Sequence, residues 1–135
     1  MSRSKLREKI FRLLFRVEFH SDEEFALQEA NFLKDEEQQQ MTEEESRQVT
    51  EKCESVIEKL DEIDGMLSEK TTGWNLQRIG KAELTILRLA VYEILFDDSI
   101  PVSVAINEAV ELARKYGAKD APSFINGVLA KFAKA

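Results

Sequence analysis

The sequence predicts an all-α protein, on three observations. The chain has 135 residues, 43% of them hydrophobic and 33% charged, a composition typical of a soluble helical domain. Five glycines and two prolines are too few for the turns of a β-sandwich or barrel. Apolar residues recur every three to four positions, as on one face of a helix. We expect one domain over residues 1–135, with about six to seven helices in two small bundles that share a buried central helix.

The first helix is expected from about Arg3 to Phe19. Helical geometry of about 100° per residue sorts its side chains into three groups. Four apolar residues form the stripe that should face the core: Leu6, Ile10, Leu13 and Val17. Four basic residues lie in one flanking sector: Lys5, Lys9, Arg12 and Arg16. Phe11, Phe15 and Phe19 form a third stripe, which either packs between the two bundles or presents one ring, that of Phe15, to a partner.

Capping signals place the next two helices. Ser21 with Glu24 predicts a helix over about 22–36, and Thr42 with Glu45 predicts a long helix to about Asp64. The run over 35–40 between them is expected to be a solvated loop. One face of the long helix is apolar, through Val49, Cys53, Val56, Leu60, Ile63 and Leu67. Cys53 is therefore expected to be a small buried hydrophobe, and His20 a surface residue at a helix end.

The C-terminal half predicts three more helices. Residues 81–96 are apolar nearly all round, which is typical of a central, buried helix. Pro101 opens a helix to Tyr116, and Asp120 begins the last one. On the central helix, Arg88 and Glu93 need partners if they are buried, and Glu108 is one option for Arg88. Glu83, near the start of that helix, is expected at the surface, where it can cap a helix or meet a partner.

Several classes of function are excluded. The glycines form no phosphate-binding loop. One cysteine and one histidine argue against a zinc site or a Cys/His triad. The acidic clusters lie at helix starts, where the dipole favours negative charge. We therefore expect no catalysis, no cofactor and no metal.

A membrane or secreted location is also disfavoured. The longest apolar stretch, 84–96, contains Arg88 and Glu93 and is shorter than the roughly 20 residues of a membrane span. The N-terminus has no apolar signal-peptide core. We expect a cytoplasmic protein that does not enter a membrane.

Charge is distributed unevenly along the chain, whose net charge is −7. Residues 1–20 carry six basic and two acidic side chains, whereas residues 21–64 carry four basic and sixteen acidic ones. The acidic segment need not cancel the basic one, because the screening length is about 8 Å at physiological salt. The basic side chains of the first helix either bind phosphates or only keep the helix soluble. Lys119 and Asp120 precede a helix N-terminus, where phosphates also bind well.

Three stretches carry a family resemblance. They are Arg78-Ile79-Gly80-Lys81-Ala82-Glu83 running into 87–93, the segment 101–113, and Phe124-Ile125-Asn126-Gly127-Val128-Leu129. The most specific is the run Ile106-Asn107-Glu108-Ala109-Val110-Glu111-Leu112-Ala113 within the second. With these stretches the sequence resembles the NusB family of bacterial transcription antitermination factors.

The resemblance implies an all-helical fold of two perpendicular bundles and a role as an RNA-binding adaptor. The implied partners are single-stranded boxA-type RNA of nascent ribosomal transcripts, the small-subunit ribosomal protein NusE, and the RNA polymerase antitermination complex. The implied RNA-binding residues are Arg3, Lys5, Arg7, Lys9, Lys119, Asp120, Phe124 and Asn126. The implied partner contacts are Phe15 and Glu83.

Two other functions and one question of assembly stay open. The chain is also compatible with a helical scaffold that binds protein only, or with the N-terminal domain of a ribosomal RNA cytosine methyltransferase. A similar helical domain begins certain methyltransferases of this kind, but the glycine-rich cofactor loop and the catalytic cysteine motif of the enzyme are absent from this sequence. The sequence does not decide between a monomer and a homodimer.

Overall fold

The fold is all-α, as the sequence predicts. The computed structural model describes residues 2–17, 27, 30–32, 34, 41–71 and 76–133, and every regular element in these ranges is a helix. The chain forms two compact units, Met1–Ile57 and Glu58–Ala135. The expected helix over 22–36 and loop over 35–40 lie largely outside the described residues, as do the Ser21–Glu24 capping box, His20 and Phe19.

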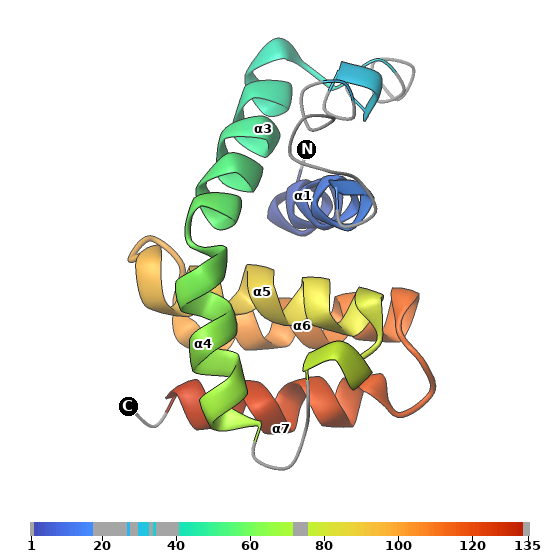
Figure 1. Cartoon of the computed structure of the whole chain (residues 1–135). Helices are drawn as coiled ribbons and strands as arrows, with labels where there is room; N and C mark the ends of the chain where they lie inside the picture. Colours follow the sequence, from blue (N-terminus) through green and yellow to red (C-terminus); the bar gives the residue numbers. More distant parts are fainter. Residues whose placement is uncertain are drawn as a thin grey trace. The chain divides into compact units, whose positions relative to one another are not determined.

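The first unit contains α1 (Arg3–Val17) and most of α3 (Glu43–Glu58) (Figure 1). Ser2 caps α1, because the Lys5 N–H donates to its Oγ at 3.2 Å. On the expected core stripe of α1, Ile10 and Leu13 are buried, while Leu6 and Val17 are half-buried. Phe11 is buried too, with its ring centroid 5.9 Å from that of the half-buried Phe15. Phe11 is therefore part of the buried core.

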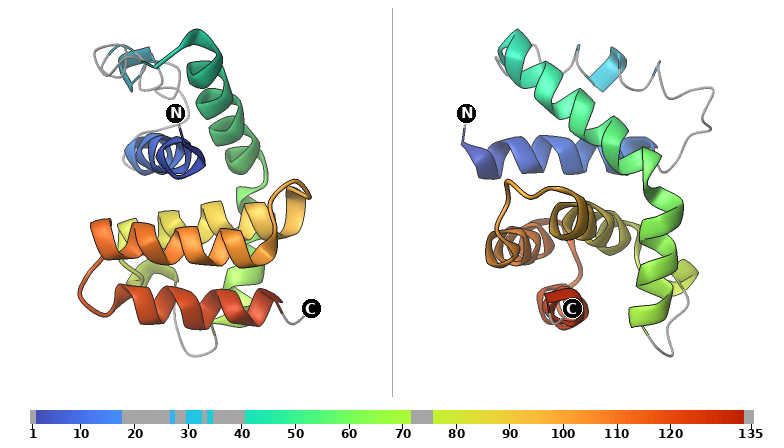
Figure 2. Two further views of the ribbon diagram at one scale, coloured as in Figure 1. Left: turned by 180° about the vertical axis from the view of Figure 1, so that it is seen from behind. Right: turned by 90° about the vertical axis from the view of Figure 1, so that its left-hand side faces the viewer.

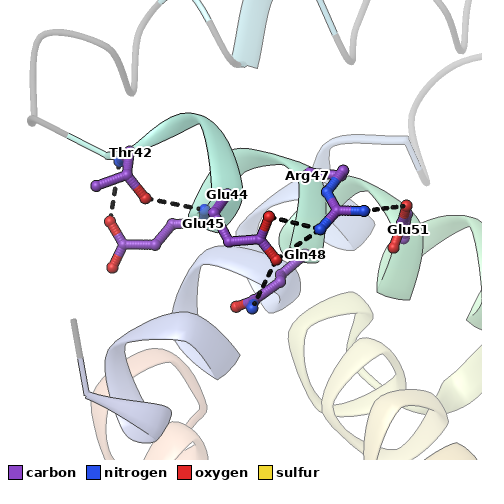
Figure 3. Close-up of polar contacts among 6 residues, drawn as sticks. All are labelled: Thr42, Glu44, Glu45, Arg47, Gln48 and Glu51. Carbon is purple, nitrogen blue, oxygen red and sulfur yellow. Dashed lines mark hydrogen bonds and ion pairs between the residues drawn. The ribbon is translucent and has the colours of Figure 1, made fainter.

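A reciprocal capping box begins α3, as predicted. The Glu45 N–H donates to Thr42 Oγ1 at 3.0 Å, and the Thr42 N–H donates to Glu45 Oε1 at 2.9 Å (Figure 3). Two backbone donors of the first turn, which has no intrahelical partners for them, are thereby satisfied. Arg47 pairs with Glu44 and Glu51 farther along the same surface (Figure 3), but such exposed pairs contribute little.

Removal of the cap should destabilise the first unit. We expect Thr42→Ala to lower the free energy of unfolding by about 1 kcal/mol, because the Glu45 N–H loses its acceptor.

The N–H of Thr42 also holds the pKa of Glu45 below its ordinary value of 4.5. Since the folded-state pKa is the lower one, this contribution is present above pH 4.5 and is lost as the pH falls through the folded value. Urea unfolding of the wild type and Glu45→Gln should converge on acidification; a gap independent of pH would contradict this.

The predicted long helix over 42–64 is in fact two helices. Lys59 leaves the helical conformation, with φ −102° and ψ 7°, and α4 then runs from Leu60 to Lys70. Five residues of the predicted apolar stripe are fully buried, namely Val49, Cys53, Val56, Ile63 and Leu67, whereas Leu60, directly after the break, is half-buried. The spacing of apolar residues predicts which side chains are buried. It does not predict the dihedral angles of a single residue, and the sequence therefore carried no sign of the break. The prediction that Cys53 is buried is confirmed.

Two glycines should respond in opposite directions to a methyl group. Gly65 lies within α4, and a Cβ there would meet nothing within 4 Å. At Gly117, a Cβ would lie 2.6 Å from Ala121 Cβ and 2.8 Å from the Ala113 carbonyl oxygen. We expect Gly65→Ala to stabilise by about 0.5–1 kcal/mol and Gly117→Ala to destabilise by about 1–3 kcal/mol. Urea unfolding measures both, and shifts of the same sign would contradict the packing described.

The second unit is built on three helices that lie side by side: α5 (Lys81–Phe96), α6 (Val102–Tyr116) and α7 (Ala121–Ala133) (Figures 1 and 2). The short 3-10 helix η2 (Leu76–Arg78) precedes α5, and α4 packs against α5 and α7 (Figure 1). Lys131 of α7 donates to the Lys70 carbonyl at 2.8 Å and so holds the end of α4.

The boundaries predicted for α5 and α6 are confirmed. Most of α5 is buried, as its apolar sequence predicts; the buried residues are Leu84, Thr85, Ile86, Leu87, Leu89, Ala90, Val91 and Glu93. Pro101 precedes α6, and its carbonyl accepts the Ala105 N–H at 3.0 Å. A proline suits this N-cap position because no hydrogen bond within the helix uses the N–H that proline lacks.

Arg88 of α5 pairs with Asp64 of α4, a partner that the sequence did not indicate. Arg88 Nε donates to Asp64 Oδ1 at 2.9 Å, and Nη2 donates to Oδ2 at 2.8 Å. Their side chains are 15% and 30% exposed. Burial, reinforced by the neighbouring Asp61 carboxylate, raises the pKa of Asp64 to about 6, and burial lowers the pKa of Arg88. Burial disfavours the charged form of both side chains, so each charge depends on the other for its stabilisation.

Candidate nucleic-acid interface

A cleft of about 270 Å³ opens in the second unit, where the residues around the start of α5 meet those around the start of α7. We call it the α5–α7 cleft. It is lined by Arg78, Ile79, Gly80, Glu83, Ala118, Asp120, Ala121 and Phe124. Two of the eight, Asp120 and Phe124, are residues that the family resemblance implies for RNA binding. A third, Glu83, was expected to contact a protein partner.

The lining combines an apolar surface with exposed charges of both signs. Ile79 and Ala121 are buried and the Phe124 ring is half-buried, whereas Arg78 and Asp120 are exposed. An aromatic face can stack on an unpaired base. A guanidinium can bind a phosphate, and a carboxylate can accept hydrogen bonds from base N–H groups. The cleft therefore offers groups that suit the face and the edge of an unpaired base and a phosphate.

Local structure around two helix starts positions these side chains. The Gly80 carbonyl accepts the Leu84 N–H at 2.8 Å and begins α5, and the Asp120 carbonyl accepts the Phe124 N–H at 3.2 Å and begins α7. Pro122 lies in the first turn of α7, where it costs no hydrogen bond. Both starts carry the positive end of a helix dipole, which favours an anionic ligand nearby.

The other two C-terminal candidates lie outside the cleft. Lys119 is exposed in the turn before α7, and Asn126 is exposed on α7 itself, but neither lines the cleft. Asn126 follows Phe124 by two residues, which places it about 200° away around the helix axis. The structure thus brings Asp120 and Phe124 together and separates Asn126 from them.

The basic residues predicted on α1 fall into two groups. Arg3 and Lys5 are exposed, but Arg7 and Lys9 are only 5% and 9% exposed, and both make further contacts within the structure. Arg7 lies on the helix face that also carries the buried Phe11 and Leu14, since residues three and four apart share a face. Of the four predicted residues on α1, Arg3 and Lys5 are thus the two that lie open to a ligand.

Sequence reasoning missed Arg78, Ile79 and Gly80 as cleft residues. Their signal was present, because they open one of the three stretches on which the family resemblance depends.

Of the two expected partner contacts, Phe15 is half-buried on α1. Glu83 Oε1 accepts the Ala118 N–H at 2.8 Å, so its carboxylate already has a role inside the second unit.

Two other kinds of site were sought in the described part of the chain. Within it, no cluster of three or more histidine, cysteine or acidic side chains is arranged to hold a metal ion. Among the described helices, none has the length and apolar character to cross a membrane.

Comparisons with known proteins identify the family. The NusB family model matches residues 4–134. The transcription antitermination protein NusB of Agathobacter rectalis is 53% identical over 133 residues, which are 98% of this chain and 100% of that protein. A solved structure of T. maritima NusB superposes with a TM-score of 0.86 at 32% identity, covering 99% of this chain and 92% of that one. A structure of NusB and NusE in complex with dsRNA shares the fold, with a TM-score of 0.79 at 24% identity, covering 99% and 98% of the two chains. The chain belongs to the NusB family.

Proposed function

We propose that this protein is an RNA-binding antitermination adaptor without catalytic activity. Together with a NusE-type ribosomal protein, it binds boxA-type RNA in nascent ribosomal transcripts and suppresses premature termination by RNA polymerase, in the cytoplasm. Membership of the NusB family supports this function. The observation that carries it is the α5–α7 cleft, which places Phe124, Arg78 and Asp120 around one space of nucleotide-binding character.

The cleft and α1 have different tasks in this proposal. In the cleft, an unpaired base stacks on the Phe124 ring and meets the Asp120 carboxylate with its N–H edge, while Arg78 binds a phosphate. On α1, Arg3 and Lys5 contact the RNA backbone without reading its sequence. Lys119 adds a cation beside the cleft. We propose that the two units serve as one RNA-binding domain over residues 1–135.

The partner protein supplies part of the affinity. A solved complex holds a NusB protein together with NusE and dsRNA, and we propose an equivalent partner for this chain. Phe15 is our candidate contact residue, because a half-buried ring on α1 retains apolar area that a partner can cover. A homodimer that covers the RNA-binding residues is an alternative state of the free protein, which sedimentation with and without RNA distinguishes.

Fluorescence anisotropy with boxA-type and scrambled RNA, with and without NusE, tests the function. We expect clear preference for boxA-type RNA when NusE is present. If about three to five phosphates are neutralised, the logarithm of affinity should fall with the logarithm of salt with a slope of roughly 2 to 3.5. Equal binding of scrambled RNA in the presence of NusE would contradict the proposal.

The double variant Arg3→Glu/Lys5→Glu separates this function from a scaffold that binds only protein. We expect it to lose RNA affinity and to retain NusE binding. Arg3 and Lys5 suit this test because they are exposed, whereas charge reversal at the buried Arg7 would also disturb the packing of α1. Unchanged RNA binding would favour the scaffold.

A further inference from the structure

The Glu83 carboxylate joins two segments that are far apart in the sequence. Glu83 lies in the first turn of α5, and its Oε1 accepts the N–H of Ala118, 35 residues away, at 2.8 Å. Ala118 belongs to the short connection between α6 and α7, together with Gly117, Lys119 and Asp120. A hydrogen bond to a carboxylate is stronger than one between neutral groups, so this contact restrains the connection.

Two glycines make room for this carboxylate. A Cβ on Gly80 would overlap Glu83 Oε2, and a Cβ on Gly117 would lie 3.0 Å from Glu83 Oε1. The backbone of Gly80 and that of Gly117 therefore each approach one of the two carboxylate oxygens. Gly80, Glu83 and Ala118 all line the α5–α7 cleft.

We propose that Glu83 is a positioning residue for RNA binding, which holds the α6–α7 connection in the conformation that shapes the cleft. This inference rests on the proposed function. Through Ala118, the carboxylate fixes the backbone that leads into Asp120 and the first turn of α7, two and three residues farther on. Phe124 follows within the same turn of helix. These contacts of Glu83 lie within the second unit and are distinct from the partner contact that the family resemblance implies for this residue.

Loss of the hydrogen bond should weaken RNA binding through the conformation of the connection, while Phe124, Asp120 and Arg78, the groups proposed to bind the base and the phosphate, all stay in place. A connection free to adopt several conformations binds RNA less tightly in proportion to the fraction that is competent. We expect Glu83→Ala to lower affinity for boxA-type RNA about three- to tenfold, if the competent fraction falls to a third or a tenth. Glu83→Gln should stay close to wild type, because its amide oxygen can still accept the Ala118 N–H.

Hydrogen exchange of the Ala118 amide, followed by NMR on the full chain, reads the contact directly. Exchange should be faster in Glu83→Ala and near wild type in Glu83→Gln. Gly80→Ala should reproduce the effect of Glu83→Ala, because the new methyl group displaces the carboxylate. The two should not add in the double variant, since both remove one interaction. Glu69→Ala, which removes an exposed carboxylate from α4, is the matched charge control and should leave the exchange unchanged.

The outcomes separate this inference from the proposed function. Unchanged Ala118 exchange in both Glu83→Ala and Gly80→Ala would overturn the inference and leave RNA binding untouched. Faster exchange with RNA affinity within about twofold of wild type would overturn the positioning role. If instead the wild type protects Ala118 but does not prefer boxA-type RNA in the presence of NusE, the proposed function fails and only the hydrogen bond remains.

Discussion

Replacing Phe124 with alanine should weaken binding of boxA-type RNA by about ten- to a hundredfold. Stacking of a base on an aromatic side chain is worth about 1–3 kcal/mol by alanine substitution. Phe124 is the one aromatic residue in the lining of the α5–α7 cleft. The salt dependence should stay unchanged, because no phosphate contact is removed. Fluorescence anisotropy at several salt concentrations, with NusE present, measures both quantities.

Two comparisons make the Phe124 result specific. Phe124→Tyr keeps an aromatic ring and should bind within about threefold of wild type, since stacking tolerates the change of ring. Asn126→Ala changes an exposed residue on another side of α7, and its effect should be smaller than that of Phe124→Ala. If Phe124→Ala binds as tightly as wild type while remaining folded, the cleft does not hold a base.

Replacing Arg88 with methionine should destabilise the second unit by about 2–4 kcal/mol. Methionine fills much of the same space but leaves the Asp64 carboxylate without its two hydrogen bonds from Arg88. Removing one partner of a fully buried ion pair costs about 3–5 kcal/mol, and the partial exposure of Asp64, at 30%, lowers that cost. Urea unfolding monitored by circular dichroism gives the change in free energy.

The double variant Arg88→Met/Asp64→Leu is the decisive comparison for the ion pair. It removes both charges at once, so it should be more stable than Arg88→Met alone. Asp64→Leu alone should also be destabilised, because Arg88 is only 15% exposed. Additive effects of the two single changes would show that Arg88 and Asp64 do not depend on each other.

Sequence periodicity predicted the helices well where one local signal was sufficient. The apolar character of residues 81–96 and the proline at 101 placed α5 and α6 at their observed bounds. The break at Lys59 had no such signal, because apolar residues keep the same spacing in the sequence on both sides of it. The Arg88–Asp64 pair was missed for a related reason. Its two members are 24 residues apart, and only the packing of α5 against α4 makes them neighbours.

At the candidate site, residue type and position along the chain did not predict which side chains are buried or which of them line the cleft. The family resemblance named Asp120 and Phe124, which meet in one cleft with Arg78, but it also named Asn126, which points elsewhere. It gave Arg7 and Lys9 the same role as Arg3 and Lys5, although only the latter two are exposed. Charge alone does not reveal burial, because long basic side chains can lie along apolar surface.

The most direct test of the central claim, that RNA occupies the α5–α7 cleft, is the footprint of the RNA on the protein. Amide chemical shifts of the labelled chain should be followed while boxA-type RNA is added in the presence of unlabelled NusE, with scrambled RNA as the reference. We predict that the shifts specific to boxA-type RNA are largest over 78–83 and 118–124, with smaller changes in the first turn of α1. Shifts confined to other surfaces, such as the exposed residues of α3, with the cleft unperturbed, would contradict the account.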